Sequence, residues 1–300
     1  MSGQKIIVVQ GATASGKTAL AIALAQHYQT EIISFDSRQF YKELAIGVAR
    51  PSIEELGQVK QHLIACRSIH EPLNANSFVQ EAQPILDQLL KDKGTAVLVG
   101  GSALFADALI LGLDPLPCDP DIQAKWQLIY DTKGLVALQV ALQQKDPSFY
   151  QQIDAMNPTR LMRALEINEL TGASNLALRK GPRKDPSPVS RIYINWPRPR
   201  LYERINQRVD QMLLEGLEDE ARQFFPKQAH LQALQTVGYR EFFDYFEGKM
   251  SREEAIEKIK QHTRNYAKRQ LTWLARYEQL NALDPTEDSN LLAAALVKIG

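Results

Sequence analysis

The chain is 300 residues long and 44% hydrophobic, so it can bury a substantial core, in one large domain with an insertion or in two unequal domains. Its formal net charge of zero argues against gross nonspecific attraction to polyanions but leaves room for a local basic face. The two cysteines, Cys66 and Cys118, form no CxxC and no Cys/His cluster, which argues against a zinc site or a disulfide framework and fits a reducing compartment.

The N-terminus carries no charged-then-apolar signal, because the apolar start "KIIVV" runs directly into a glycine-rich loop. No apolar run approaches the roughly 18 residues that a membrane span needs. The sequence therefore predicts a cytoplasmic protein without a membrane partner, and its lack of an evident dimerisation element favours a monomer.

The first hundred residues alternate between strand and helix patterns. The β-branched run Lys5–Gln10 predicts a buried strand, and the apolar spacing in Ser15–Tyr28 predicts a helix. A second short strand is expected at Glu31–Ser34, an amphipathic helix at Ser77–Lys91 and a third buried strand at Thr95–Gly101. This order predicts a parallel sheet with crossover helices.

The composition changes at Leu113–Asp121, where three prolines fall within a few residues, and Ile122 to about Thr171 is expected to be helical throughout. Within it, Asn157 is a plausible N-cap before Pro158, and Gly172 marks the end of the last helix. A basic, proline-rich loop follows, and the alternating segment Arg191–Trp196 then reads as a strand that returns to the sheet.

These patterns predict an α/β fold with a P-loop NTPase-like parallel sheet. Residues 1–114 and 190–300 form the expected catalytic core with its C-terminal helices. Residues 115–189 form the expected helical insertion domain.

Residues 11–18, "GATASGKT", fit the pattern G-x-x-x-x-G-K-[ST] directly after the first strand and before a helix. The glycines allow successive backbone N–H groups to point inward, and the helix N-terminus adds positive potential. Lys17 supplies a mobile charge, and Thr18 supplies a hydroxyl that can face Mg²⁺. The loop is specific for phosphate but does not say which phosphate it holds.

Asp36 follows the second strand and is expected to face Lys17, because ligands of open parallel sheets bind at the carboxyl ends of the strands. Three roles are open for it: a Mg²⁺ ligand, a general base that takes a proton from a nucleophile, or an Asx-turn or helix cap. The neighbouring Ser37, Arg38 and Gln39 can hydrogen-bond a heterocycle or a phosphate.

The third strand ends at Gly100, Gly101 and Ser102, where many NTP hydrolases carry an acidic residue. This weakens the interpretation as a plain ATPase. The glycine pair permits either close approach to a substrate or simply a tight turn into a helix.

Basic residues gather locally despite the neutral total. The segment Lys258–Tyr277 carries six lysines and arginines and no acidic residue, and a basic stripe on one helix face can follow a phosphate backbone. The loop Arg179–Lys184 can add to the same surface. Arg204 and Arg208 lie one turn apart and can either clamp a pyrophosphate or pair with Glu203 and Asp210.

Eight motifs occur in order between about residues 5 and 285: "GATASGKT", "DSRQFY", "IGVARP", "VGGSALF", "TRLMRALE", "RINQRVDQML", "TVGYREFFDY" and "YAKRQLTWL". Together they closely resemble the isopentenyl-tRNA transferase (IPP transferase) family, the tRNA dimethylallyltransferases, in its bacterial form. The resemblance implies transfer of a dimethylallyl group from dimethylallyl diphosphate to the exocyclic N6 amine of the adenosine on the 3′ side of the tRNA anticodon, with release of pyrophosphate.

The resemblance also implies site residues. Asp36 would be the general base, with Ser102 and Lys17 beside the reacting centre, and Thr18 would face Mg²⁺. The diphosphate would be held by Gly11, Ala12, Thr13, Ala14, Ser15, Gly16, Lys17, Thr18 and Arg208. The tRNA would be contacted by Asp36, Ser37, Arg38, Gln39, Ser102, Gln123, Thr159, Arg160, Leu161, Met162, Arg163, Gln235, Thr236, Val237, Gly238, Tyr239, Arg240 and the helix around Lys268–Ala275, which includes Arg269. Lys260 and Arg264 are added as tRNA contacts because they lie on the same basic helix face as Lys268.

The chain departs from the family pattern at a few positions. Ala12 replaces a usual proline, Ala45 and Val48 replace an acid and a threonine, and Gln123 stands where an arginine is common. Ser102 replaces a threonine and keeps the hydroxyl. A P-loop kinase for a nucleotide or small molecule is the alternative enzyme, and an RNA-binding module with a relic loop is the non-catalytic alternative.

Overall fold

The computed structural model describes residues 4–114, 116–178, 189–277 and 280–300. The chain divides into two compact units: unit 1 is Met1–Leu111 with Asp185–Gly300, and unit 2 is Gly112–Lys184. The basic loop Arg179–Lys184 lies outside the described residues. Among the helices of the described ranges, none combines the length and the apolar content needed to cross a membrane.

Unit 1 is built on a sheet of six parallel strands in the order β3-β2-β4-β1-β5-β6, which confirms the predicted α/β class. The strands are β1 Lys5–Gln10, β2 Ile32–Ser34, β3 Gln61–His62, β4 Thr95–Val99, β5 Val189–Ile194 and β6 Asn281–Leu283. The three strands expected in the first hundred residues are present. The short strands β3 and β6 were not predicted.

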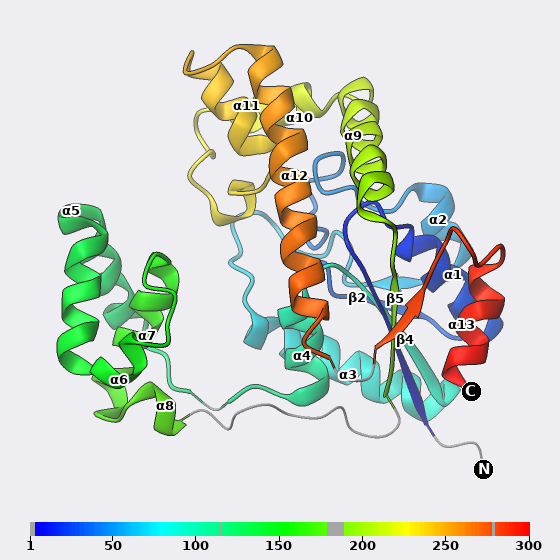
Figure 1. The fold of residues 1–300 in the computed structure, drawn as a ribbon, viewed down its shortest axis with the longest axis horizontal. Coiled ribbons are helices and arrows are strands. Elements are labelled where there is room, and N and C mark those ends of the chain that lie inside the picture. The colour runs from blue at the N-terminus through cyan, green and yellow to red at the C-terminus, as the bar shows by residue number, and fades with distance from the viewer. Residues whose placement is uncertain (1–3, 115, 179–188, 278–279) are drawn as a thin grey trace. The chain divides into compact units, whose positions relative to one another are not determined.

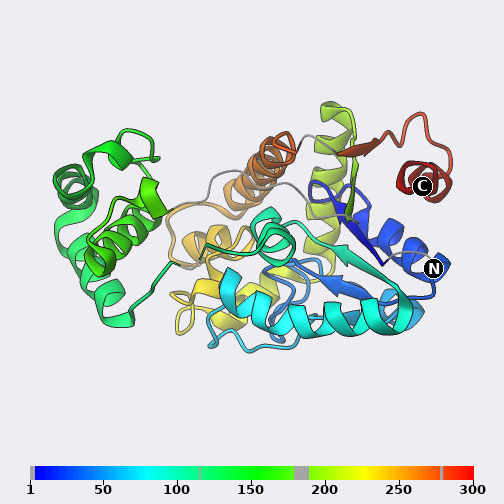
Figure 2. The same ribbon diagram turned by 90° about the horizontal axis from the view of Figure 1, so that it is seen from below.

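Helices cover both faces of this sheet (Figures 1 and 2). The helices in the described part of unit 1 are α1 Lys17–His27, α2 Ile53–Gln58, α3 Ala75–Lys93, α4 Ala103–Leu111, α9 Arg198–Leu214, α10 Leu217–Phe224, α11 Tyr239–Phe246, α12 Arg252–Leu274 and α13 Leu291–Ile299, with a 3₁₀ turn, η1, at Gln232–Leu234. Along β1, Val8 packs in the core with α3 and α4, whereas Ile7 and Val9 pack with α1 and α13. The alternation of a strand thus accounts for the two hydrophobic layers.

The long helix α12 has a well-defined start and a buried anchor near its end. At the start, the Ser251 hydroxyl accepts the N–H of Glu254 while the Glu254 carboxylate accepts the N–H of Ser251, which is a capping box. Near the end, the Trp273 indole donates to Asp107 of α4 at 3.1 Å, and Asp107 also pairs with the fully buried Arg191 of β5 at 3.1 Å. Because a buried charge is stable only when paired, this cluster ties α12 firmly to the sheet.

Unit 2 is helical across Ile122–Thr171, as expected, and it consists of separate helices. Its helices are α5 Pro120–Lys145, α6 Pro147–Tyr150, α7 Pro158–Thr171 and α8 Asn175–Leu178. α5 is interrupted at Gly134, whose φ of 73° is left-handed, and a turn follows α6. The predicted ends of α7 are confirmed: the Asn157 side chain accepts the N–H of Arg160, and Gly172 closes the helix with a φ of 66°.

Candidate active site

The carboxyl ends of β1, β2 and β4 meet at a cavity of about 1470 Å³ that lies wholly within unit 1. Its wall combines the phosphate loop, the segment after β2, the end of β4, the loop 45–51, α9 and α12. This is where ligands of parallel sheets bind. Pockets for small ligands usually measure about 300–1000 Å³, so the cavity is large for a single small molecule.

The phosphate loop has the backbone of an anion cradle. Gly16 takes a left-handed conformation with a φ of 95° immediately before α1 begins at Lys17. The Ser15 hydroxyl is buried against Gly11 and does not reach the cavity wall, which Thr13, Gly16 and Thr18 line. The Lys17 ammonium lies 3.5 Å from the Ala12 carbonyl oxygen. These features match the predicted diphosphate-holding loop in shape.

Two side chains support the loop from outside. The Trp196 indole donates to the carbonyl of Ser15 at 2.9 Å, and Nε of Arg204 donates to the carbonyl of Ala14 at 2.9 Å. The Arg204 guanidinium also lies 4.6 Å from the centre of the Trp196 ring. Arg204 therefore supports the loop through its bond to Ala14, and both Arg204 and Arg208, one turn further along α9, line the cavity.

The alternative pairing of Arg204 and Arg208 with neighbouring acids is not what the described residues show. Glu203 pairs with Arg200 at 3.1 Å, and Asp210 pairs with Lys260 of α12 at 2.7 Å. Arg208 lines the cavity, where Asp36, Glu55 and Glu215 are the acidic residues that influence its charge.

Asp36 uses its two carboxylate oxygens differently. Oδ1 accepts the N–H of Arg38 at 3.2 Å, which is the turn expected of an aspartate at a strand end. Oδ2 lies toward Gly101, 3.5 Å from the place that a Cβ on that residue would take. One oxygen therefore orders the turn, and the other can act on a ligand.

Asp36 interacts electrostatically with two cations of the cavity. Burial lowers the pKa of Lys17 to about 8, the negative charge of Asp36 partly opposes this, and the positive charge of Arg208 adds to it. Burial likewise lowers the pKa of Arg208, against the attraction of Asp36. The described wall of the cavity contains Lys17 and six arginines against three acidic residues, Asp36, Glu55 and Glu215, so it carries an excess of positive charge that suits an anionic ligand.

The first glycine of the pair after β4 is required by the packing of the protein itself. A Cβ on Gly100 would lie 2.5 Å from the Phe35 ring and 2.8 Å from the backbone nitrogen of Asp36. Glycine is therefore required so that the ends of β2 and β4 can approach each other. The cavity wall reaches Val99 and Gly100, and Ser102 follows at the start of α4, where its carbonyl accepts the N–H groups of Phe105 and Ala106.

Gln270 of α12 is a site residue that the sequence reasoning missed. Its side-chain oxygen accepts the N–H of Thr13 at 2.9 Å, and its amide nitrogen donates to the carbonyl of Gly101 at 2.9 Å. Gln270 is 7% exposed and lines the cavity. It lies within the motif "YAKRQLTWL", in the helix Lys268–Ala275 that the resemblance assigns to tRNA, but no local pattern marks its bonds to Thr13 and Gly101.

Glu220 of α10 organises the loop 45–51. Its carboxylate accepts the N–H groups of Ala45 at 3.0 Å, Ile46 at 2.9 Å and Gly47 at 2.9 Å, and the hydroxyl of Tyr239 at 2.6 Å. Glu220 is 8% exposed. Burial and the negative charge of Glu220 together raise the pKa of the Tyr239 phenol, so that it remains a donor.

We expect Glu220→Gln to lower the free energy of unfolding by about 2–4 kcal/mol, because an amide nitrogen cannot accept and leaves buried donors unsatisfied. Urea denaturation measures the change. The matched control is Glu218→Gln on the same helix: Glu218 pairs with Arg222 and Arg252 at the surface, so its loss is expected to cost at most about 1 kcal/mol. Equal losses in the two variants would contradict the anchoring role.

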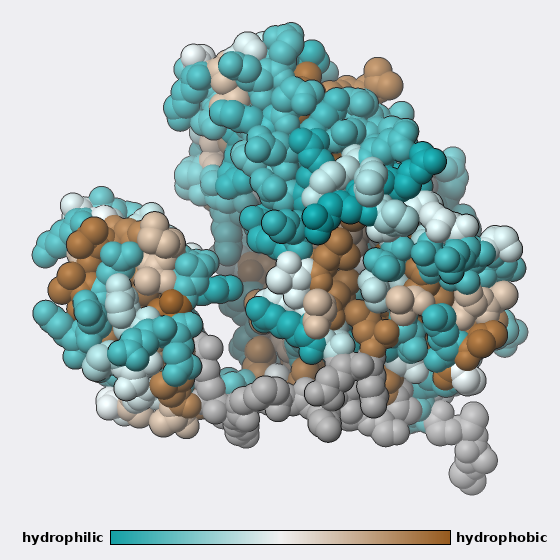
Figure 3. Space-filling view, in the orientation of Figure 1, coloured by the Kyte–Doolittle hydropathy of each residue, from teal (hydrophilic) through white to brown (hydrophobic). Residues whose placement is uncertain are grey.

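The residues of unit 1 that the resemblance assigns to tRNA divide into exposed and engaged ones. Lys268 and Arg269 are exposed, and so are Gln235 and Arg240, although Gln235 donates to the carbonyl of Ala229 and Arg240 pairs with Glu241. Others are engaged: Gln39 donates to the carbonyls of Val48 and Ala49, Arg38 donates to the carbonyl of Gln232, Thr236 donates to the carbonyl of Ala233, and Gly238 and Tyr239 are buried. Ser37 and Val237 line the cavity. The surface over α9 and α12 is mainly hydrophilic on the face that Figure 3 shows.

Lys260 and Arg264 do not form a free basic stripe with Lys268. Lys260 pairs with Asp210 of α9, and Arg264 donates to the Asn206 side chain of α9 at 2.7 Å. Both side chains therefore join α12 to α9.

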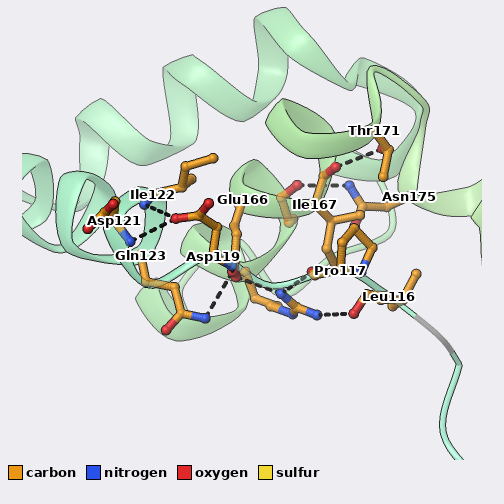
Figure 4. Close-up of polar contacts among 12 residues, drawn as sticks. Leu116, Pro117, Asp119, Asp121, Ile122, Gln123, Glu166, Ile167, Thr171 and Asn175 are labelled. Carbon is orange, nitrogen blue, oxygen red and sulfur yellow. Dashed lines mark hydrogen bonds and ion pairs between the residues drawn. The ribbon is translucent and has the colours of Figure 1, made fainter.

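In unit 2, the predicted tRNA residues Gln123 and Arg163 converge on the buried carboxylate of Glu166 (Figure 4). Glu166 is 1% exposed and also accepts the N–H of Asp119 at 2.8 Å, while Arg163 reaches the carbonyl of Pro117 at 2.8 Å. Gln123 thus donates one of the hydrogen bonds that satisfy the Glu166 carboxylate. Thr159 and Arg160 are exposed, Met162 is half-buried, and Leu161 is fully buried, so the Leu161 side chain cannot contact RNA.

A magnesium ion fits this site only if the ligand supplies most of its coordination. Within the ranges that the structure describes, no cluster of three or more histidine, cysteine or acidic residues suits a metal. Thr18 and Asp36 both line the cavity beside the phosphate loop and offer oxygen atoms. Mg²⁺ is commonly held by one or two protein oxygens, phosphate oxygens and water, so this donor set is compatible with a diphosphate-bound ion.

The sequence of the chain is similar to one protein family and to known members of it. A family profile described as IPP transferase matches residues 39–277. The tRNA dimethylallyltransferase of Flavobacterium johnsoniae is 42% identical over 98% of this chain and 97% of the relative. The tRNA dimethylallyltransferase 1 of Bacteroides fragilis is 38% identical over 98% of each chain.

Solved structures of transferases have a fold similar to that of this chain. The tRNA isopentenylpyrophosphate transferase of Bacillus halodurans superposes with a TM-score of 0.73 at 32% identity, covering 99% of this chain and 97% of that one. A eukaryotic dimethylallyltransferase acting on tRNA gives a TM-score of 0.80 at 24% identity, covering 98% of this chain and 78% of that one, which supports the fold alone.

Proposed function

Because the chain belongs to the IPP transferase family, we propose that it is a tRNA dimethylallyltransferase that moves a dimethylallyl group from dimethylallyl diphosphate to the N6 amine of the adenosine on the 3′ side of the anticodon. Pyrophosphate is the leaving group, so a kinase-like loop is present without phosphoryl transfer. Since the substrate is tRNA, we place the enzyme in the cytoplasm, and we propose that it works as a monomer.

The main observation behind this proposal is that one cavity contains both the cations that can hold a diphosphate and a carboxylate that can accept a proton from the amine. The phosphate loop and Arg208 supply positive charge, and Asp36 supplies a carboxylate beside them. A volume of about 1470 Å³ accommodates a prenyl diphosphate and a nucleoside together. An adenosine must leave the base stack to enter such a cavity, as it does in other base-modifying enzymes.

In the proposed mechanism the exocyclic amine attacks the allylic carbon, and the bond from that carbon to the diphosphate oxygen breaks. The electron pair leaves with pyrophosphate, whose negative charge Lys17, Arg208 and the N–H groups of the loop stabilise. Asp36 accepts the proton that the amine loses, through the oxygen that does not cap the turn. Mg²⁺, when bound near Thr18, adds neutralising charge to the diphosphate.

The proposal is tested by incubating the protein with undermodified tRNA and either dimethylallyl diphosphate or labelled ATP, followed by nucleoside analysis of the tRNA. We expect dimethylallyladenosine from the prenyl donor only, with release of one pyrophosphate per transfer. Phosphoryl transfer from ATP would instead indicate a kinase. Tight tRNA binding with transfer from neither donor would indicate a non-catalytic RNA-binding protein.

We propose Lys268 and Arg269, rather than Lys260 and Arg264, as the basic residues of α12 that meet tRNA, because only the former pair is exposed. The double variant Lys268→Gln, Arg269→Gln is expected to weaken tRNA binding and to reduce the slope of log affinity against log salt by about 1.5, since each phosphate contact contributes about 0.7–0.9. Filter binding at several salt concentrations measures both.

The matched control removes two equally exposed charges from α3, as Lys91→Gln with Lys93→Gln. Both double variants change the net charge by the same amount. An equal slope in the two would mean that α12 acts only through the overall charge and would contradict the proposed contact.

A further inference from the structure

The side chain of Gln270 joins two loops of the cavity that lie far apart in the sequence. The side-chain oxygen of Gln270 accepts the N–H of Thr13 in the phosphate loop, 257 residues away. Its amide nitrogen donates to the carbonyl of Gly101, 169 residues away. The first loop holds the leaving group in the proposed reaction. The second lies against Asp36 and leads to Ser102.

The contact with Gly101 is close as well as polar. A Cβ on Gly101 would lie 2.4 Å from Nε2 of Gln270 and 3.5 Å from Oδ2 of Asp36. The amide of Gln270 and the carboxylate of Asp36 therefore approach the same bare backbone carbon. Any larger residue at position 101 would displace one of them, so the absence of a side chain there allows the two groups to lie together.

Glutamine suits this place because its amide offers an acceptor and donors on one planar group. These two partners are backbone groups, the Tyr266 side chain also hydrogen-bonds Gln270, and Gln270 is 7% exposed, so an unsatisfied partner would be costly. Its helix is anchored nearby: Trp273, one turn further along α12, donates to the half-buried Asp107, which pairs with the fully buried Arg191. Because α12 is anchored, Gln270 holds the two loops that it bonds at fixed positions in the cavity wall.

We infer that Gln270 is a positioning residue that fixes the distance between the phosphate loop and the Gly101 turn, and so between the departing diphosphate and the base Asp36. This inference rests on the proposed function. Displacement at carbon needs the leaving group and the attacking amine in line, and an error of about 1 Å costs as much as 100-fold in rate. Gln270 acts through the backbone of its two partners and needs no contact with the substrate.

The test replaces Gln270 with methionine, which keeps the length of the side chain and removes both hydrogen bonds. We expect kcat to fall about 10- to 100-fold while KM for dimethylallyl diphosphate and for tRNA changes less than about threefold. Hydrogen exchange of peptides spanning Gly11–Lys17 is expected to be about tenfold faster, because the N–H of Thr13 loses its acceptor. The control is Gln261→Met, at an exposed position of the same helix, which is expected to behave as wild type.

A second variant, Gln270→Glu, keeps the acceptor for Thr13 and loses the donor to Gly101. We expect wild-type exchange in the phosphate loop and a reduced kcat, because only one half of the bridge is broken. This variant decides the question if the methionine variant does not fold. A kcat within about twofold of wild type in either folded variant, or a rise in KM that accounts for the whole loss, would overturn the inference.

The experiments distinguish a failure of the proposed transferase function from a failure of the positioning role of Gln270. If the wild-type protein transfers no dimethylallyl group, the proposed function is wrong, and the exchange comparison alone decides whether Gln270 holds the phosphate loop. If the wild type transfers normally and Gln270→Met does too, only the positioning role is wrong.

Discussion

Asp36→Asn is expected to lower kcat about 10²- to 10⁴-fold while a non-reactive alkyl diphosphate still binds within about threefold of wild type. Asparagine keeps an oxygen that can accept the N–H of Arg38, so the turn after β2 survives. It removes the carboxylate that accepts the proton from the amine. Single-turnover transfer to tRNA measures the chemical step, and calorimetry measures diphosphate binding.

This variant separates the three roles that the sequence leaves open for Asp36. A purely structural aspartate would leave the Asn variant nearly as active as wild type, because the turn is retained. A magnesium ligand would give a loss that raised Mg²⁺ concentration largely restores, since a weakened site can be refilled by mass action. A general base gives a loss that is insensitive to Mg²⁺, and this is the result that we expect.

Local chemistry explains which parts of the fold the sequence predicts. The long apolar runs of β1 and β4 and the capping residues Asn157 and Gly172 act through their immediate neighbours, so their patterns are visible in a short window. β3 consists only of Gln61–His62 and has no apolar run, so pairing with β2 rather than propensity makes it a strand. Likewise, nothing but its left-handed conformation marks Gly134 as the interruption in α5.

In the site too, residues that belong to a local sequence pattern were predicted, whereas residues that depend on distant partners were not. The phosphate loop is one continuous motif, and Asp36 follows from the rule that ligands bind beyond strand ends, so both were predicted before the fold was known. Gln270 and Glu220 depend on partners 169–257 residues away in the sequence, and no local pattern records such a bond. Charge counting failed for Lys260 for the same reason: Asp210 meets it from another helix.

Lys17→Met is expected to lower kcat about 10²- to 10³-fold, because a preorganised cation on the departing pyrophosphate is lost at the point where charge develops. Unlike the loss of Asp36, this change also weakens diphosphate binding, since Lys17 attracts the diphosphate before and during reaction. Arg208 alone cannot compensate, because it reaches the cavity from α9 rather than from the phosphate loop. A variant that binds and turns over normally would remove Lys17 from the mechanism.

The pKa of Lys17 makes this role visible without mutation. Burial lowers that pKa to about 8, so the fraction of charged Lys17 in the free protein falls as the pH rises from 7 to 9. Binding needs the charged form, so affinity for an alkyl diphosphate is expected to fall toward a tenfold loss per pH unit above about pH 8. Carboxylates and guanidinium groups ordinarily do not titrate in this range, and an alkyl diphosphate completes its own ionisation at lower pH.

The control for this pH dependence is the same Lys17→Met variant, in which calorimetry between pH 7 and 9 is expected to give weak but constant affinity. A slope that persists in the variant would assign the titration to another group. A flat profile in the wild type would mean that the lysine keeps its charge through the whole range, despite its burial and the neighbouring charge of Arg208. The two profiles together therefore test both the role of the lysine and the electrostatic environment that the cavity gives it.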